Sequence, residues 1–266
     1  SQVEYISKVL KRFNMENAKP LSTPLPTYVK LSTSDCPTCD EEKEFMTKIP
    51  YQSAVGSLMY AMVATRPDIA FAVGAVSRFM SNPGKKHWDA VKLILRYLSG
   101  TKDKCLCLGK GNASIIGYTD SDYAGCADSR KSTSGYIFQI MGGAIAWRSR
   151  LQECVALSTT EAEYIAASEA CKEAVWLSRL ACDMGIPQHV PKLFCDSQSA
   201  LALAKNPVYH SKTKHIGVRY HFIRECIANG YISLEKVASR ENAADALTKA
   251  LPQDALEHCC HLMGIT

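Results

Sequence analysis

The residues of this chain best suited to chemistry are acidic side chains at the ends of predicted elements. Asp120 ends a predicted strand, and Asp196 ends a second strand that follows a long predicted helix. If these strands are parallel neighbours, about 4.8 Å apart, both carboxylates lie at the carboxyl edge of the sheet, where open α/β sheets bind ligands. Two close anions repel each other, and a hard divalent cation such as Mg²⁺ or Mn²⁺ removes that conflict.

Further acidic positions on two helices could complete such a site. Ser158 precedes Glu161 by three residues, as in an S-x-x-E capping box. Thr160 stands in the same relation to Glu163, so the pattern alone does not separate the two glutamates. Asp245 begins the last predicted helix, where the helix dipole favours an acid without any ligand role. Singly, each acid is more often solvated surface than a ligand, whereas the set in this order is far more specific.

A mixed α/β architecture is predicted to position these acids. Strand patterns cover residues 114–120, 135–141, 144–148, 192–195 and 231–237, and a further short strand or hairpin continuation covers 153–157. Gly142-Gly143 marks a hairpin between two of them. Helical patterns cover 158–184, 199–205 and 218–228, and a last helix begins within 243–250. The order predicts an antiparallel hairpin followed by strands reached through helical crossovers.

The part of the chain before this α/β unit reads as mostly helical. An amphipathic pattern opens the chain, and residues 20–40 are rich in Pro, Ser and Thr, as in a linker. Three helical stretches then follow within 51–100. We therefore predict a tail and linker over 1–40, a helical segment over 41–112 and an α/β domain over 113–266.

Bulk composition narrows the class of protein. The 266 residues are 47% hydrophobic and 21% charged, which argues against a disordered chain, and the net charge of +5 permits nucleic-acid binding without requiring it. Cys36 and Cys39 have no second pair of ligands at zinc spacing, so a structural zinc site is not expected. The twelve cysteines are therefore interpreted as reduced thiols. No signal peptide is evident, and no apolar run reaches the roughly 18 residues of a membrane span. The helical pattern beginning directly at Ser1 predicts a fragment of a longer polypeptide.

Several segments resemble a known family. The runs that resemble the active-site segments of ribonuclease H are 118–121 (Tyr-Thr-Asp-Ser), 160–167, 195–198 and 241–245. The closer resemblance is to the Pol polyproteins of copia-type LTR retrotransposons, in particular the plant Tnt-like elements, and is carried by the runs 130–136, 155–164, 213–216 and 219–221. The upstream runs 55–60, 65–69 and 96–98 resemble the end of its reverse transcriptase and the connection segment.

This resemblance implies a ribonuclease H-like fold with a mixed five-stranded sheet. It also implies an endonuclease that hydrolyses the RNA strand of RNA–DNA hybrids with two Mg²⁺ ions, for which Mn²⁺ can substitute. One ion would activate a water and the other would stabilise the leaving 3′-oxygen. The implied metal-binding and catalytic tetrad, in which Glu163 is chosen over Glu161, is Asp120, Glu163, Asp196 and Asp245.

Candidate contacts to the hybrid lie near these acids. The polar candidates are Ser121, Ser197, Gln198 and Asn242, and the basic ones are Arg130, Lys131 and Lys214. Turn formation, helix capping and solvated surface charge are the competing interpretations. His210, His215 and His221 are assigned to backbone or phosphate contacts rather than to a metal site. Asp122, next to the tetrad, is interpreted as a turn residue.

The resemblance also bounds the function. No Tyr-x-Asp-Asp motif is present, so this segment is not expected to synthesise DNA. Residues 238–240 hold no histidine before the last acid, and Gly217 stands where the family usually has an acid. The upstream reverse transcriptase region is the expected partner, inside cytoplasmic virus-like particles, with the nucleus as the alternative location. Proofreading exonucleases or integrases, a catalytically silent remnant and a hybrid-binding connection domain remain the alternatives, and the oligomeric state stays open.

Overall fold

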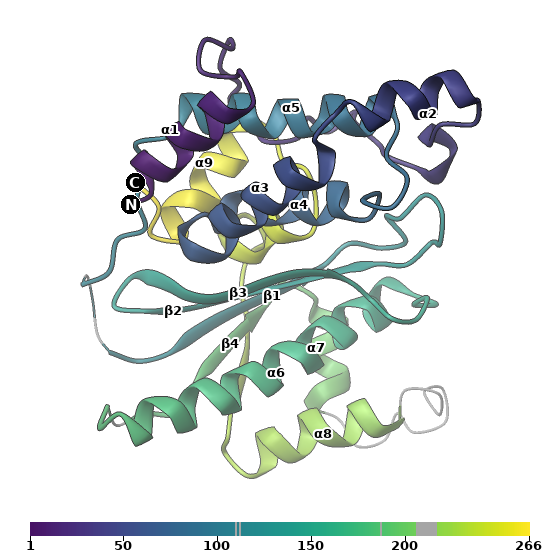
Figure 1. The fold of residues 1–266 in the computed structure, drawn as a ribbon. Coiled ribbons are helices and arrows are strands. Elements are labelled where there is room, and N and C mark those ends of the chain that lie inside the picture. The colour runs from purple at the N-terminus through teal and green to yellow at the C-terminus, as the bar shows by residue number, and fades with distance from the viewer. Residues whose placement is uncertain (110, 112, 187, 206–216) are drawn as a thin grey trace.

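The structure is a computed structural model that describes residues 1–109, 111, 113–186, 188–205 and 217–266, and of residues 217–221 the backbone alone. Its elements form three layers, with a sheet between two sets of helices (Figure 1). The set on the side of both chain ends comprises α1 (Val3–Arg12), α3 (Tyr51–Thr65), α4 (Ala70–Ser77), α5 (Lys85–Gly100) and α9 (Gln253–Leu262). The opposite face is covered by α6 (Thr159–Asp183), α7 (Gln198–Lys205) and α8 (Gly217–Ala228).

The sheet has five strands in the order β3-β2-β1-β4-β5. They are β1 (Ile116–Ser121), β2 (Thr133–Ile140), β3 (Gly143–Leu151), β4 (Lys192–Cys195) and β5 (Ser233–Lys236). β1 pairs antiparallel with β2 and parallel with β4, and β4 pairs parallel with β5. The predicted α/β class with a mixed five-stranded sheet is therefore confirmed. The parallel pairing of β1 with β4 brings their carboxyl ends to one edge.

The hairpin between β2 and β3 turns one residue earlier than the sequence predicted. Its turn residues are Met141 and Gly142, whose positive φ angles of 49° and 76° suit a two-residue hairpin turn. Gly143 is instead the first residue of β3. A Cβ there would lie 2.2 Å from the carbonyl oxygen of Cys107, so this glycine serves close backbone approach and not the turn.

The strand predicted over 153–157 is wrong. β3 ends at Leu151, and an irregular segment connects it to α6. The amide group of Gln152 holds this connection, since it donates to Ser134 Oγ at 2.8 Å and to the carbonyl oxygen of Ala162 at 3.0 Å. A buried side chain thus replaces the strand pairing that the sequence suggested.

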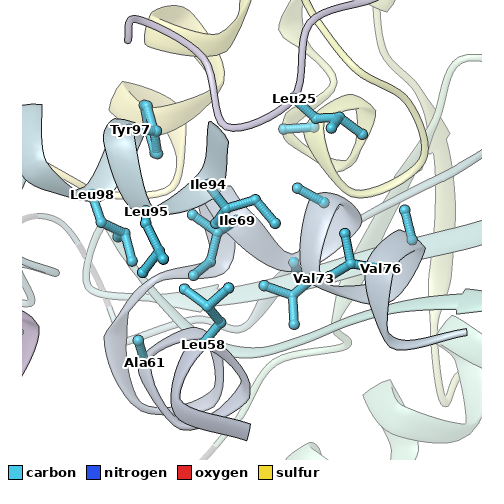
Figure 2. Close-up of a cluster of buried hydrophobic side chains, with 14 of the residues drawn as sticks. Leu25, Leu58, Ala61, Ile69, Val73, Val76, Ile94, Leu95, Tyr97 and Leu98 are labelled. Atoms are coloured by element: carbon cyan, nitrogen blue, oxygen red, sulfur yellow. The ribbon is translucent and has the colours of Figure 1, made fainter. Parts of the chain in front are cut away.

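A large hydrophobic core lies between the helices on the side of the chain ends. Apolar residues at helical spacing on α5, including Ile94 and Leu98, meet Leu58 of α3 and Val73 of α4 (Figure 2). All four side chains are fully buried. Each such burial contributes roughly 1.5–3 kcal/mol. Small residues fill much of α3 and α4, and several of them belong to this core.

The same core continues onto the sheet and the end of the chain. Ile137 of β2 belongs to it, as do Leu247, Leu256 and Met263 from the last part of the chain. The helical segment and the face of the sheet that packs against it therefore share one hydrophobic core. A boundary between 112 and 113 stays a prediction, and residues 253–266 pack with the helical segment.

A fully buried ion pair sits inside this helical segment. An Nη of Arg66 lies 2.7 Å from the Asp68 carboxylate, and neither side chain has exposed surface. The hydroxyl of Tyr97 donates to the same carboxylate at 2.7 Å, and Arg66 also donates to the carbonyl oxygen of Thr101 at 2.9 Å. These bonds offset the cost of burying both charges. The Arg-Pro-Asp run therefore has a structural role.

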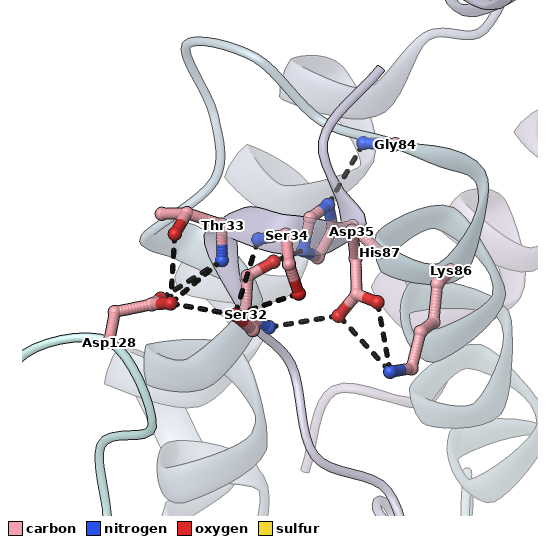
Figure 3. Close-up of polar contacts among 8 residues, drawn as sticks. All are labelled: Ser32, Thr33, Ser34, Asp35, Gly84, Lys86, His87 and Asp128. Atoms are coloured by element: carbon pink, nitrogen blue, oxygen red, sulfur yellow. Dashed lines mark hydrogen bonds and ion pairs between the residues drawn. The ribbon is translucent and has the colours of Figure 1, made fainter. Parts of the chain in front are cut away.

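The Pro-rich stretch over residues 20–40 is attached to the α/β part of the chain. Here the Asp128 carboxylate, from the loop between β1 and β2, accepts from Ser32 Oγ at 2.7 Å and from Thr33 Oγ1 at 2.8 Å (Figure 3). It also accepts from the backbone N–H of Thr33 at 3.0 Å, and Lys86 binds Asp35 beside it at 3.0 Å. We call the Asp128 contacts with Ser32 and Thr33 the linker latch. A helix not predicted from the sequence, α2 (Asp40–Thr47), follows directly.

Two general features concern the described part of the chain. No helix there is both long and apolar enough to span a membrane. Its cysteines are free thiols.

Candidate active site

Two of the acids come from neighbouring strands. Asp120 is the second-last residue of β1 and is only 2% exposed. Asp196 directly follows β4, whose last residue, Cys195, pairs with Thr119 of β1. Since the pairing is parallel, Asp120 and Asp196 both occupy the position after a paired residue, at the same edge of the sheet.

A short turn supplies the third acid. Asp245 lies in the 3₁₀ turn η6 (Ala243–Leu247) and not in the α-helix expected to begin there. That helix, α9, begins only at Gln253, since Pro252 disfavours helical backbone at the residue before it. The amide of Asn242 anchors η6 to the sheet by donating to the carbonyl oxygen of Thr119 at 3.0 Å and accepting from Ala244 N at 3.2 Å. Asn242 has no exposed surface, which supports the anchoring role, and its contact with substrate stays a prediction.

The start of α6 separates Glu161 from Glu163. Ser158 Oγ accepts from Glu161 N at 3.1 Å, and the Glu161 carboxylate accepts from Leu157 N at 2.9 Å. Glu161 therefore caps the helix, as the S-x-x-E pattern allowed. Glu163 lies half a turn further along, on the side of the helix that faces Cys195 and Asp196.

Side-chain atoms from these elements form one cluster. The ligand atoms of Asp120, Asp196 and Asp245 lie within 4.8 Å of one another. Those of Glu163, Cys195 and Asp196 also lie within 4.8 Å of one another, so Asp196 joins the two groups. We call the four carboxylates the acid cluster; its members are Asp120, Glu163, Asp196 and Asp245.

Burial and mutual repulsion make Asp120, Glu163 and Asp245 hold protons tightly. Burial, followed by repulsion from Asp245, raises the pKa of Asp120 to about 7. Burial, followed by repulsion from Asp120 and Asp196, raises the pKa of Glu163 to about 9. Burial also raises the pKa of Asp245. Without a cation, the cluster therefore cannot be fully ionised at neutral pH at low free-energy cost.

The chemistry of the cluster fits a hard divalent cation. Glu163 Oε2 and Asp245 Oδ1 are buried oxygens without a hydrogen-bond partner in the structure. Such groups are costly unless a partner is supplied. Burial raises the pKa of the Cys195 thiol to about 12, so it is neutral and the anionic donors are all oxygens. An oxygen-only donor set selects Mg²⁺ or Mn²⁺ over softer metals.

Thr248 and Lys249 also contact the acid cluster, and neither of them was identified from the sequence. Lys249 Nζ lies 3.0 Å from Asp245 Oδ2 and 3.9 Å from Asp120 Oδ2. The hydroxyl of Thr248 donates to Asp120 Oδ2. The spacing of Lys249, four residues after Asp245, is the signal that could have indicated the ion pair.

Polar residues around the acid cluster are mostly engaged within the protein. Ser121 donates to the carbonyl oxygen of Thr133 at 3.2 Å, and Ser197 caps α7 by accepting from Ala200 N at 3.2 Å. These bonds agree with the turn and cap interpretations, and contact of either residue with substrate stays a prediction. The carboxylate of Asp122 accepts from Thr133 N and so also has a turn role. Gln198 is exposed at the start of α7.

The basic candidates divide by location. Arg130 is exposed and Lys131 is partly exposed in the loop between β1 and β2, which leaves the sheet beside Asp120. Their contact with phosphates stays a prediction. Lys214, His210 and His215 lie outside the described residues, and so does the side chain of His221.

The chain is similar to polyproteins of plant transposons. The retrovirus-related Pol polyprotein from transposon TNT 1-94 of Nicotiana tabacum is 58% identical over 265 residues, which are 100% of this chain and 20% of that protein. The corresponding polyprotein from transposon RE2 of Arabidopsis thaliana is 39% identical over 267 residues, again 100% of this chain and 18% of that protein. This chain thus spans about a fifth of the length of these relatives.

Solved structures give a weaker likeness. The ribonuclease H1 LC11, isolated from compost by a metagenomic approach, covers 55% of this chain and 96% of its own, with a TM-score of 0.41 and 18% identity. No protein-family model matches the chain. Since that TM-score is below 0.5, the interpretation of the site depends on its own geometry and on the polyprotein relatives.

Proposed function

Because the chain belongs to the family of copia-type LTR-retrotransposon Pol polyproteins, we propose that its sheet domain is a ribonuclease H that hydrolyses the RNA strand of RNA–DNA hybrids. The observation that carries this proposal is the meeting of four carboxylates, from β1, α6, the end of β4 and η6, at one edge of the sheet. Two buried carboxylate oxygens there lack protein partners. Such a site is suited to phosphodiester hydrolysis assisted by divalent cations.

The acid cluster would hold the cations. Two Mg²⁺ ions, or Mn²⁺ in their place, would supply a nucleophile at neutral pH and stabilise the leaving oxygen. The residues of the chain fix where this happens. Thr248 orients the Asp120 carboxylate by a hydrogen bond, and Asn242 holds η6, and hence Asp245, against β1. The cap of α6 formed by Ser158 fixes where Glu163 lies.

The residues proposed to contact the substrate are those exposed at the same edge of the sheet as the acid cluster. Gln198 is exposed at the start of α7, two residues after Asp196, where it could reach the sugar edge of a hybrid. RNA-containing duplexes are told from DNA mainly by 2′-hydroxyls and groove shape. Arg130 and Lys131 flank the same edge and are suited to phosphate contacts, which position a duplex without reading its sequence. Lys214 remains a candidate outside the described residues.

The wider setting is also a proposal. The upstream reverse transcriptase region of the same polyprotein would be the partner, and reverse transcription in cytoplasmic particles would be the location. DNA synthesis is not expected of this segment, which has no Tyr-x-Asp-Asp motif. The nuclease would remove RNA from the hybrid that the polymerase region makes.

A cleavage assay with a matched variant tests the proposal. The chain is incubated with Mg²⁺ and end-labelled RNA–DNA hybrid, single-stranded RNA, double-stranded RNA or double-stranded DNA. We expect cutting of the hybrid RNA strand alone, leaving 5′-phosphate and 3′-hydroxyl ends, and loss of cutting with EDTA. Asp196→Asn is expected to stop cutting while circular dichroism and hybrid binding stay unchanged.

Other outcomes would favour the alternatives. Cutting of double-stranded DNA would indicate an exonuclease or integrase type of enzyme. Tight hybrid binding without any metal-dependent cutting would indicate a hybrid-binding connection domain or a silent remnant. Equal cutting by wild type and Asp196→Asn would refute the assignment of the acid cluster as the active site.

A further inference from the structure

Lys249 is placed by backbone geometry to reach into the acid cluster. Lys249 lies two residues after the 3₁₀ turn that carries Asp245, and its N–H donates to the carbonyl oxygen of Asp245 at 3.3 Å. The lysine side chain therefore lies over the aspartate that precedes it by four residues. Its Nζ lies 3.0 Å from Asp245 Oδ2 and 3.9 Å from Asp120 Oδ2. One ammonium thus bridges two members of the acid cluster.

The environment of this ion pair differs from that of a surface salt bridge. The Asp120 and Asp245 side chains are only 3% and 16% exposed, whereas that of Lys249 is 46% exposed. Water screens the pair from the lysine side only, so the attraction is stronger than in an exposed pair. Within the described part of the chain, Lys249 is the one cation ion-paired to the acid cluster.

We propose that Lys249 is an internal counter-cation that occupies the place of a metal ion between Asp120 and Asp245 and is displaced when the metal binds. This inference rests on the metal site proposed above. A divalent ion bound to these two carboxylates would repel an ammonium held 3.0 Å from Asp245 Oδ2. The same oxygen cannot serve both cations fully. Loading of the site is therefore a competition between the lysine and the metal.

The exposure of Lys249 makes this exchange feasible. Nearly half of the side chain already contacts solvent, so the ammonium can turn outward into water while the rest of the side chain keeps its packing. Two consequences follow. The metal-free protein is protected from repulsion among its carboxylates, and the site demands a higher metal concentration than its acids alone would.

Metal binding measured without substrate tests the proposal. Mn²⁺ affinity is determined by isothermal titration calorimetry for wild type, Lys249→Met and Lys249→Arg at pH 8. We expect Lys249→Met to bind Mn²⁺ tighter by roughly 10–100-fold, the range over which groups that touch metal ligands change affinity. Lys249→Arg keeps the charge and is expected to remain near wild type. In EDTA, Lys249→Met is expected to melt below wild type, and saturating Mn²⁺ is expected to remove that difference.

A matched lysine controls for general loss of charge. Lys172 of α6 forms an exposed ion pair with Glu169 at 2.8 Å and lies nine residues, or about 13 Å along the helix axis, from Glu163, so Lys172→Met should leave Mn²⁺ affinity unchanged. Equal or weaker Mn²⁺ binding by Lys249→Met would refute the counter-cation role while leaving the proposed nuclease site intact. Failure of wild type and variant alike to bind Mn²⁺ would refute both proposals.

Discussion

Replacing Glu163 by glutamine should stabilise the metal-free protein at alkaline pH. Burial and neighbouring carboxylates raise the pKa of Glu163 from 4.5 to about 9. Because the folded-state pKa is raised, this group favours folding at low pH, and that contribution is lost as pH rises from 4.5 towards about 9. At about 1.4 kcal/mol per pH unit, wild type loses about 4 kcal/mol between pH 5 and pH 8.

Glutamine removes the titration but not the burial. Relative to the protonated carboxyl group, its amide places one more N–H at the position of Glu163 Oε2, which has no hydrogen-bond partner, and this costs about 1–3 kcal/mol at either pH. We therefore expect Glu163→Gln to be less stable than wild type by about 2 kcal/mol at pH 5 and more stable by about 2 kcal/mol at pH 8. In thermal unfolding, that corresponds to roughly 4–8 °C.

The measurement is thermal or urea unfolding in EDTA, followed by circular dichroism at pH 5 and pH 8. Glu169→Gln, on the same helix but in an exposed ion pair with Lys172, is the control and should show little change at either pH. Saturating Mg²⁺ should stabilise wild type more than Glu163→Gln, because the variant lacks one ligand. An equal shift at both pH values, or destabilisation at pH 8, would refute the electrostatic reasoning.

Two further predictions concern the framework around the site. Asp68→Asn breaks the buried ion pair with Arg66 and should lower the free energy of unfolding, measured by urea titration, by about 3–5 kcal/mol. The control Asp89→Asn breaks an exposed ion pair with Lys92 and should change the free energy of unfolding by less than about 0.5 kcal/mol. Asp128→Ala removes the linker latch; hydrogen exchange of the Thr33 amide should then be faster by about tenfold, while global stability falls by less than about 1 kcal/mol. Unchanged Thr33 exchange would show that the latch does not hold this segment.

The parts of the fold that were predictable are those where one physical pattern dominates. The strand 192–195 was recognised from its short apolar run, and its parallel pairing with β1 follows from the helical crossover between them. That pairing alone brings Asp120 and Asp196 together. The long helix was recognised from its apolar stripe and from the Ser158 cap, which the structure shows.

Other features depend on contacts that the local pattern does not reveal. Glu161 and Glu163 share the same capping signature, and only the direction of α6 relative to β4 separates them. Asn242 is polar and adjacent to an acid, yet it is buried because η6 needs an anchor on β1. Gly143 was predicted to lie in the turn because it follows Gly142. Its actual role, close approach to Cys107, could not be predicted because Cys107 is far away in the sequence. The family resemblance, not the periodicity, selected Glu163.

The core that joins the helical segment to the sheet limits how the two parts of this chain can be separated. Ile137 and Leu247 of the α/β part are fully buried and belong to the same hydrophobic core as residues of α3, α4 and α5. A recombination event that transferred residues 113–266 alone would carry these apolar side chains into water. A hybrid element that acquires residues 113–266 therefore gains a folded domain only if the helical segment is transferred with them or the recipient already has a matching surface. We therefore expect the two parts to be inherited as a single block.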